Sequence, residues 1–161
     1  MNDLKFSFNP ISNKNSTVLI LGFMPGEQSL ALQQYYAHPQ NKFWKVIATI
    51  TNSDITITYA DKEKLLFQNN IALWDIIKYA NREGSLDSAI KNEQPNNISD
   101  FIIKHKKLET ICFNGKKAEA LYRKYFAMER TINYISLPSI SPANASINLE
   151  NICIQWKSIF H

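Results

Sequence analysis

The chain has 161 residues, a length that suits one compact domain with a core of its own. Its 45% hydrophobic and 20% charged residues exclude wholesale disorder, and its net charge of +4 permits a polyanionic partner without demanding one. No apolar run approaches the ~18 residues of a membrane span, and the first residues lack the basic and apolar regions of a signal peptide. Cys112 and Cys153 lie in apolar surroundings and are expected to be buried, inert thiols. We therefore expect a cytoplasmic protein with no membrane partner and one domain over residues 1–161.

A strand, a stiff loop and two helices are predicted in the first part of the chain. Residues 17–21 form a short apolar run that ends at Gly22, which is typical of a buried strand. A loop then extends to residue 41. Apolar residues recur on one side of a helix over residues 41–50, and residues 59–69 indicate a second helix.

The remaining chain continues to alternate strands and helices. Residues 70–75 form another buried apolar run, which ends in the carboxylate of Asp75. Residues 79–97 are polar and predict a long connection with one helical turn that starts near Ser85 or Asp87. Beyond this connection we expect a helix at 98–106, a strand at 109–113, a helix at 116–128, a strand at 131–137 and an amphipathic helix at 149–160.

This alternation predicts an α/β fold with a mainly parallel sheet of four strands and helices on both faces. In such sheets the ligand crevice lies at the carboxyl ends of the strands. Four loops converge there and carry most of the glycine and proline residues of the chain: 22–41, 75–87, 114–117 and 138–146. The functional site is therefore expected among these loops.

The loop after the first strand allows a backbone to approach a ligand closely. It reads Gly22-Phe23-Met24-Pro25-Gly26; the two glycines lack a Cβ atom and the proline fixes its own φ. Its order matches neither a phosphate-binding P-loop nor a GxGxxG motif. Tyr35 and Tyr36 follow, and aromatic rings exposed beside a crevice suit a flat, unsaturated ligand such as a base. The alternative is that both tyrosines cap the core.

Two motifs resemble those of the uracil-DNA glycosylase superfamily. The loop at residues 22–26, followed by Tyr36-Ala37-His38-Pro39-Gln40-Asn41-Lys42-Phe43-Trp44, is similar to the first motif of that superfamily. Leu137-Pro138-Ser139-Ile140-Ser141-Pro142-Ala143-Asn144-Ala145 resembles its second motif. The resemblance is closest to the DNA-deoxyinosine (hypoxanthine) glycosylase branch and to the mismatch-specific uracil/thymine glycosylases, and it covers essentially the whole chain.

The resemblance implies base excision. The family fold is a three-layer α/β/α sandwich around a four-stranded parallel sheet, the same class that the pattern of strands and helices predicts. Its members flip a damaged base out of DNA and hydrolyse the N-glycosidic bond. The resemblance therefore implies a monofunctional enzyme and a monomer that acts on double- or single-stranded DNA carrying hypoxanthine or uracil, and that needs no metal or organic cofactor.

The resemblance also assigns substrate-binding residues where positions match. The loop from Gly22 to Gly26 would lie against the base and the sugar, and Tyr36 would stack on the flipped base. Asp75 falls near a base-reading position, where its carboxylate would accept a hydrogen bond from a base N–H; capping of the following turn is the alternative. Asn114, at the crevice end of the third strand, is a further candidate for substrate binding.

The second motif resembles the segment that grips DNA phosphates and inserts a wedge into the vacated base stack. Ser139, Ser141 and Asn144 are the candidate phosphate partners. The wedge position falls near Pro142 or Ala143, which are small residues for that task. This segment is therefore the expected DNA-binding element.

One position departs from the family pattern. Met24 stands where many members carry an Asp or Asn that positions or activates water, and a thioether can do neither. The resemblance assigns the catalytic role to Asn41, whose amide would orient water or bond near the sugar, while His38 holds the loop. Such a site suits a dissociative reaction with an oxocarbenium-like transition state. The alternative use of Asn41 is to cap a helix over residues 42–50.

Two further functions stay open at this point. Met24 favours a non-catalytic nucleic-acid or nucleotide-binding module on the same fold, and a weaker alternative is a hydrolase of free nucleosides. Basic residues at 116–117 and 123–124 flank the crevice loops. They indicate either a DNA footprint or a solvated helix face.

Overall fold

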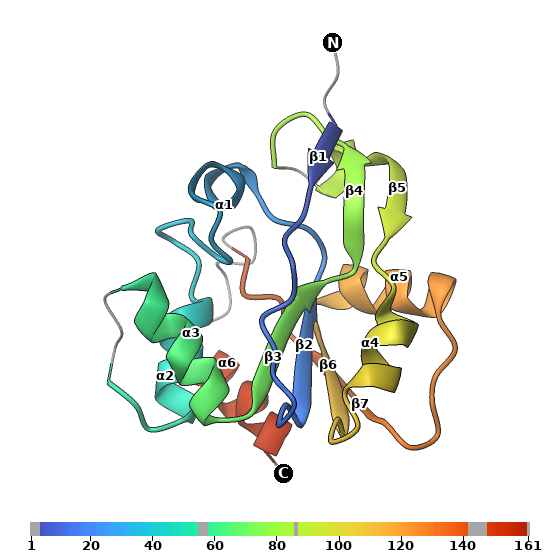
Figure 1. Cartoon of the computed structure of the whole chain (residues 1–161). Helices are drawn as coiled ribbons and strands as arrows, with labels where there is room; N and C mark the ends of the chain where they lie inside the picture. The colour runs from blue at the N-terminus through green and yellow to red at the C-terminus, as the bar shows by residue number, and fades with distance from the viewer. Residues whose placement is uncertain (1–3, 55–57, 86, 142–147, 161) are drawn as a thin grey trace.

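The computed structural model of the chain describes residues 4–54, 58–85, 87–141 and 148–160 (Figure 1). The strands are β1 (Leu4–Phe6), β2 (Val18–Gly22), β3 (Ile71–Asp75), β4 (Ile77–Asn81), β5 (Lys91–Pro95), β6 (Thr110–Asn114) and β7 (Asn133–Leu137). The α-helices are α1 (Glu27–Leu32), α2 (Phe43–Ile50), α3 (Tyr59–Gln68), α4 (Ile98–Lys104), α5 (Lys116–Tyr125) and α6 (Leu149–Trp156). Two 3₁₀ turns, η1 (Asp87–Ala89) and η3 (Lys157–Phe160), complete the described elements.

The main sheet contains the four strands that the apolar runs predicted. Its order is β3-β2-β6-β7, and every neighbouring pair is parallel. The parallel order confirms the predicted α/β class, because parallel neighbours require a crossover between each pair of strands. All four strands consequently end at the same edge, where β3 pairs Asp75 with Gly22 of β2 and β6 pairs Asn114 with Leu137 of β7.

The sheet is covered by helices on both faces, as Figure 1 shows, with α2, α3 and α6 on one side and α4 and α5 on the other. Side chains alternate along each strand, so Ile20 and Leu73 face the first group while Leu21 and Phe113 face the second. All four of these side chains are at most 1% exposed. The three-layer α/β/α arrangement is therefore confirmed.

A second, smaller sheet was not predicted, and the expectation of a long polar connection over residues 79–97 is wrong. Strands β4 and β5 within that stretch pair antiparallel, and β1 adds to the other edge of β4. The sequence hides these strands because Lys91–Pro95 is built from residues with low strand propensity, and the register between β4 and β5 shifts twice. The predicted helical turn is present as η1.

Helix α1 was also missed, since residues 22–41 were expected to form a loop. It has only six residues, and its N-cap Gly26 provides no side-chain cap. It ends at Gln33, which has a left-handed φ of 54°. A helix this short shows too few turns to produce an amphipathic repeat in the sequence.

The cysteine prediction holds for one residue only. Cys112 is buried in the main sheet, and burial raises the pKa of its thiol to about 12. Cys153 is only half-buried, which corrects the expectation that both thiols are enclosed. Within the described ranges, no helix is long and apolar enough to cross a membrane.

Candidate active site

The site begins at the edge where the parallel strands end. Asp75 and Gly22 are paired across β3 and β2, and Asn114 follows Phe113, the partner of Leu21. By the alternation along each strand, these three end residues lie on the face that also carries Ile20, Leu73 and Cys112, toward α2 and α6. The sheet therefore brings together three of the predicted site residues from separate parts of the sequence.

Gly22 lies directly beneath two polar side chains. A Cβ atom added to this residue would be 2.5 Å from Oδ1 of Asp75 and 2.7 Å from the hydroxyl oxygen of Tyr36. Real Cβ atoms essentially never come so close to other atoms, so only glycine leaves room for both oxygens. The first glycine of the loop thus serves the assembly of the site itself, by letting Asp75 and Tyr36 converge.

Tyr36 is held by its ring and by its hydroxyl group. The ring stacks on Phe43 of α2 with centroids 4.1 Å apart, and the hydroxyl accepts a hydrogen bond of 3.0 Å from Nδ2 of Asn114. Oδ1 of Asn114 in turn accepts from the N–H of Ile140, at 3.2 Å. Asn114 therefore links the first motif, through Tyr36, to the second motif, through Ile140.

Tyr35 does not share this place, and the expectation that both tyrosines line the crevice is wrong. Tyr35 is only 4% exposed, and its hydroxyl donates to the carbonyl of Asn9 at 2.8 Å. Its main-chain carbonyl accepts from Nε1 of Trp44 at 2.9 Å. The two tyrosines diverge because Tyr36 has a left-handed φ of 54°. Tyr35 is a core residue, so the alternative that both tyrosines cap the core holds for Tyr35.

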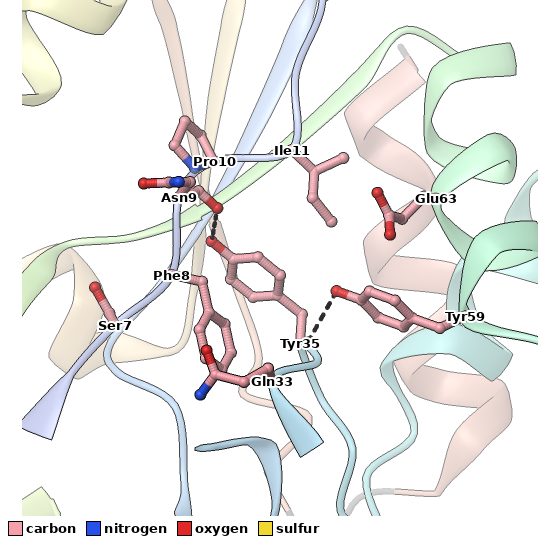
Figure 2. A pocket seen from close by; sticks show the side chains of 9 residues that line it. All are labelled: Ser7, Phe8, Asn9, Pro10, Ile11, Gln33, Tyr35, Tyr59 and Glu63. Carbon is pink, nitrogen blue, oxygen red and sulfur yellow. Dashed lines mark hydrogen bonds between the residues drawn. The ribbon is translucent and has the colours of Figure 1, made fainter. Parts of the chain in front are cut away.

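Tyr35 instead forms one wall of a separate groove of about 390 Å³, shown in Figure 2. In that view Tyr59 and Tyr35 approach each other, and the hydroxyl of Tyr59 accepts a hydrogen bond from the main-chain N–H of Tyr35 at 3.0 Å. The groove is lined by Ser7, Phe8, Asn9, Pro10, Ile11, Gln33, Tyr35, Tyr59 and Glu63. Apart from Tyr35, no described residue of the predicted site lines it, so the groove is distinct from the strand-end site.

Asp75 is a buried carboxyl group, with 4% of its surface exposed. Burial raises the pKa of Asp75 to about 7, and the positive charge of Arg82 opposes that rise. The N–H groups that follow it do not need its side chain as a cap, because Ile76 donates to the carbonyl of Gly22 and Ile77 to that of Phe23. The carboxyl group therefore lies over Gly22 rather than capping the next turn.

Phe23 and Met24 turn away from this cluster toward the small sheet. Met24 is 9% exposed and packs with Ile77 and Ala80. Phe23 is half-buried against the same three residues. Met24 is thus a core residue, and the predicted substrate-binding role of Phe23 and Met24 stays a prediction.

Asn41 lies at the start of α2. The helix begins at Phe43 with Lys42 as its N-cap, so the predicted cap at Asn41 is one residue too early. Oδ1 of Asn41 nevertheless accepts a hydrogen bond from the N–H of Phe43 at 2.9 Å. This bond closes a turn just before the helix. The carbonyl of His38 accepts from the N–H of Asn41 at 2.9 Å, and Nδ1 of His38 accepts from the N–H of Gln40 at 3.1 Å. His38 holds this loop, as expected.

The second motif is described as far as Ser141. Ser139 packs against Gly115, where a Cβ atom would lie 3.0 Å from that of the serine, and Gly115 has a φ of 95°. Oγ of Ser139 accepts from the N–H of Ser141 at 3.2 Å. The predicted DNA-binding residues Pro142, Ala143 and Asn144 lie outside the described residues.

The basic residues near the site divide into two kinds. Lys116 and Lys117 are exposed at the start of α5, directly after Asn114 and Gly115. Farther along the helix, Arg123 forms an ion pair of 3.1 Å with Glu119, and Lys124 lies 4.0 Å from Glu93. The pair closest to the strand ends is therefore the better candidate for contact with a polyanion.

Comparisons with known proteins agree with this geometry. A family model described as the Uracil DNA glycosylase superfamily matches residues 10–157. A hypoxanthine DNA glycosylase of Methanosarcina acetivorans is 36% identical over 160 residues, which cover 98% of each chain. A hypoxanthine DNA glycosylase of Methanosarcina barkeri is 39% identical over 115 residues, or 71% of this chain and 73% of that protein.

A solved structure shows the same fold. It is a solution NMR structure of a protein from Methanosarcina acetivorans that is described as a candidate uracil DNA glycosylase. The TM-score is 0.80 at 34% identity, over 98% of this chain and 99% of that chain. With both motifs meeting at the strand ends, and with a family model that spans nearly the whole sequence, the chain belongs to the uracil DNA glycosylase superfamily.

Proposed function

We propose that the protein is a monofunctional DNA glycosylase that releases hypoxanthine or uracil from DNA. The observation that carries the proposal is the meeting of Gly22, Tyr36, Asp75 and Asn114 at the strand ends of a chain whose relatives are named hypoxanthine DNA glycosylases. The proposal takes the protein as a cytoplasmic monomer, with one domain over residues 1–161.

The flipped base would be held between an aromatic ring and polar groups. Tyr36 would offer a ring for stacking, an interaction worth about 1–3 kcal/mol per base. The carboxylate of Asp75 would accept from a base N–H, because an ionised carboxylate is an acceptor only. The Asn114 amide has two Nδ2 hydrogens, so it can hold Tyr36 and still donate to a base.

Bond cleavage would be dissociative. The bond between C1′ of the sugar and the base nitrogen breaks with its electron pair on the base, which leaves an oxocarbenium-like sugar. Water then adds at C1′, and its proton ends on the departing base. Asn41 would place this water or the sugar through its amide, in keeping with the absence of a carboxylate at Met24.

The direct test is a panel of duplexes that carry inosine, uracil, xanthine or a G·T mismatch, incubated with excess protein. We expect free base and an alkali-labile abasic site from the inosine or uracil duplex, with no strand cleavage before alkali. The proposal fails if none of the duplexes yields abasic sites. Binding to DNA without base release would favour the non-catalytic module, and release from free inosine alone would favour a nucleoside hydrolase.

DNA binding is expected to depend on Lys116 and Lys117. Replacing both with Gln should weaken binding to DNA of any sequence and lower the slope of log affinity against log salt by about 1–2. Fluorescence anisotropy with a labelled duplex, over a series of salt concentrations, measures both quantities.

The matched control for this prediction is Lys106→Gln with Lys107→Gln, which removes the same charge. These two residues lie between α4 and β6, at the edge where the parallel strands begin. They should leave the salt slope nearly unchanged. Equal slopes for the two double variants would show that net charge, and not this part of the surface, governs binding.

A further inference from the structure

Arg82 is a buried charged side chain that neither motif contains. It is 1% exposed and directly follows β4 of the small sheet. A guanidinium group is charged at every pH that a protein tolerates, so its burial needs partners that compensate for the lost water. Arg82 interacts with two residues of the predicted site.

The first partner is the loop of the first motif. Nη2 of Arg82 donates to the carbonyl of Pro25. The same loop is also bonded to the small sheet and to the turn that follows β4: the N–H of Ile77 donates to the carbonyl of Phe23 at 3.2 Å, and the N–H of Glu27 donates to Oγ of Ser85 at 2.8 Å. Arg82 thus fastens the middle of a loop whose flanks are bonded to the same strand and turn.

Arg82 also acts on Asp75 through its charge. The carboxyl group of Asp75 in turn acts on the hydroxyl groups of Tyr36 and Tyr35. Burial raises the pKa of both tyrosines, which keeps their hydroxyl groups neutral in the working range of pH. The positive charge of Arg82 thus opposes the effect of burial on the pKa of Asp75.

We propose that Arg82 is a positioning residue, which fixes the Gly22–Gly26 loop through Pro25 and supplies the positive charge that allows Asp75 to act as a hydrogen-bond acceptor for the base. It touches neither the base nor the sugar, and it acts through the loop and through Asp75. The consequence of Arg82 for catalysis rests on the proposed function. The effect of Arg82 on Asp75 does not depend on that function.

The experiment compares Arg82→Met and Arg82→Lys with Lys5→Met. Lys5 is the matched control, because it also lies on the small sheet and donates to a main-chain carbonyl, that of Gly84, at 3.2 Å. The first readout is the titration of the Asp75 carboxyl carbon by NMR, with Asp75→Asn to identify the signal. The second is the pH profile of kcat/KM for base release.

Burial raises the pKa of Asp75 to about 7 in the presence of Arg82. Arg82→Met should move the NMR midpoint upward by about one pH unit or more, because a nearby positive charge favours the ionised carboxylate. The limb of kcat/KM that rises with pH as Asp75 ionises should move by the same amount. Arg82→Lys and Lys5→Met should keep both midpoints near the wild-type position.

An unchanged NMR midpoint in Arg82→Met overturns the proposal, whatever the effect on stability, since a merely structural arginine would leave it in place. If the NMR midpoint moves but the wild-type protein releases no base, the proposed function fails and the electrostatic role of Arg82 stands. Should Arg82→Met not fold, Arg82→Gln takes its place in the NMR titration, because glutamine removes the charge and keeps an N–H donor for the carbonyl of Pro25.

Discussion

Asn41→Ala is expected to lower the rate of base release by at least about 100-fold, the loss typical when one group that stabilises a transition state is removed. The amide of Asn41 is fixed for this task by the loop, since the N–H of Asn41 donates to His38 and its Oδ1 accepts from Phe43. Residue 24 cannot take over the role of Asn41, because it is a methionine and its side chain packs in the core of the small sheet. Single-turnover release of hypoxanthine at saturating protein measures the effect.

Asn41→Ser separates catalysis from local structure. A serine hydroxyl can accept the N–H of Phe43 as the asparagine does, so this variant should keep most of the stability of the turn. Asn41→Ala should in addition lose about 0.5–2 kcal/mol, as other capping side chains do. We expect both variants to be inactive although only the alanine is less stable. A serine variant with wild-type activity would reduce Asn41 to its role at the helix start.

The parts of the fold that could be predicted from the sequence are those where a local pattern of apolar residues indicates burial. Strands β2 and β3 are covered on both faces, so nearly every residue in them is apolar and each appears as a continuous run. Their carboxyl ends were therefore placed correctly, and with them Gly22 and Asp75. Family resemblance added predicted roles that no local pattern indicates, such as that of Asn41.

The small sheet and Arg82 escaped prediction for a common reason. Strand β5 is polar and β1 has three residues, so both are strands only because they pair with β4, as Leu4 does with Asn81. Arg82 follows β4 in a polar stretch, where one more charged residue carries no signal. Its burial arises from tertiary contacts that local sequence cannot report.

The neighbouring tyrosines show the same limit on a smaller scale. Both residues are tyrosines, and no local sequence pattern distinguishes a ring in the core from a ring at the site. The left-handed φ of Tyr36 sends the two hydroxyl groups to Asn9 and Asn114, which lie in distant parts of the sequence. A side chain's direction at such a turn depends on those partners, so it becomes known only with the structure.

Gly22→Ala should damage the site more than any other single methyl group added to the first loop. The new Cβ would lie 2.5 Å from Oδ1 of Asp75 and 2.7 Å from the hydroxyl of Tyr36, where Asp75 is buried and the Tyr36 ring is stacked on Phe43. Overpacking of this kind costs about 1–3 kcal/mol of stability. Because Asp75 and Tyr36 must both move, we expect base release to fall by about 100-fold or more, as misplacement by about 1 Å commonly does.

Gly26→Ala is the matched control for that substitution, since it adds the same methyl group to the same loop. Its Cβ would meet Oγ of Ser85 at 3.3 Å, and Ser85 is exposed and able to shift by a few tenths of an ångström. At the N-cap of α1, alanine in place of glycine should cost no more than about 1 kcal/mol and leave base release within about tenfold of wild type. Thermal unfolding and single-turnover release measure both variants. Equal losses of base release in the two variants would mean that the loop tolerates no added methyl group at either glycine. The convergence of Asp75 and Tyr36 over Gly22 would then not explain the effect of Gly22→Ala.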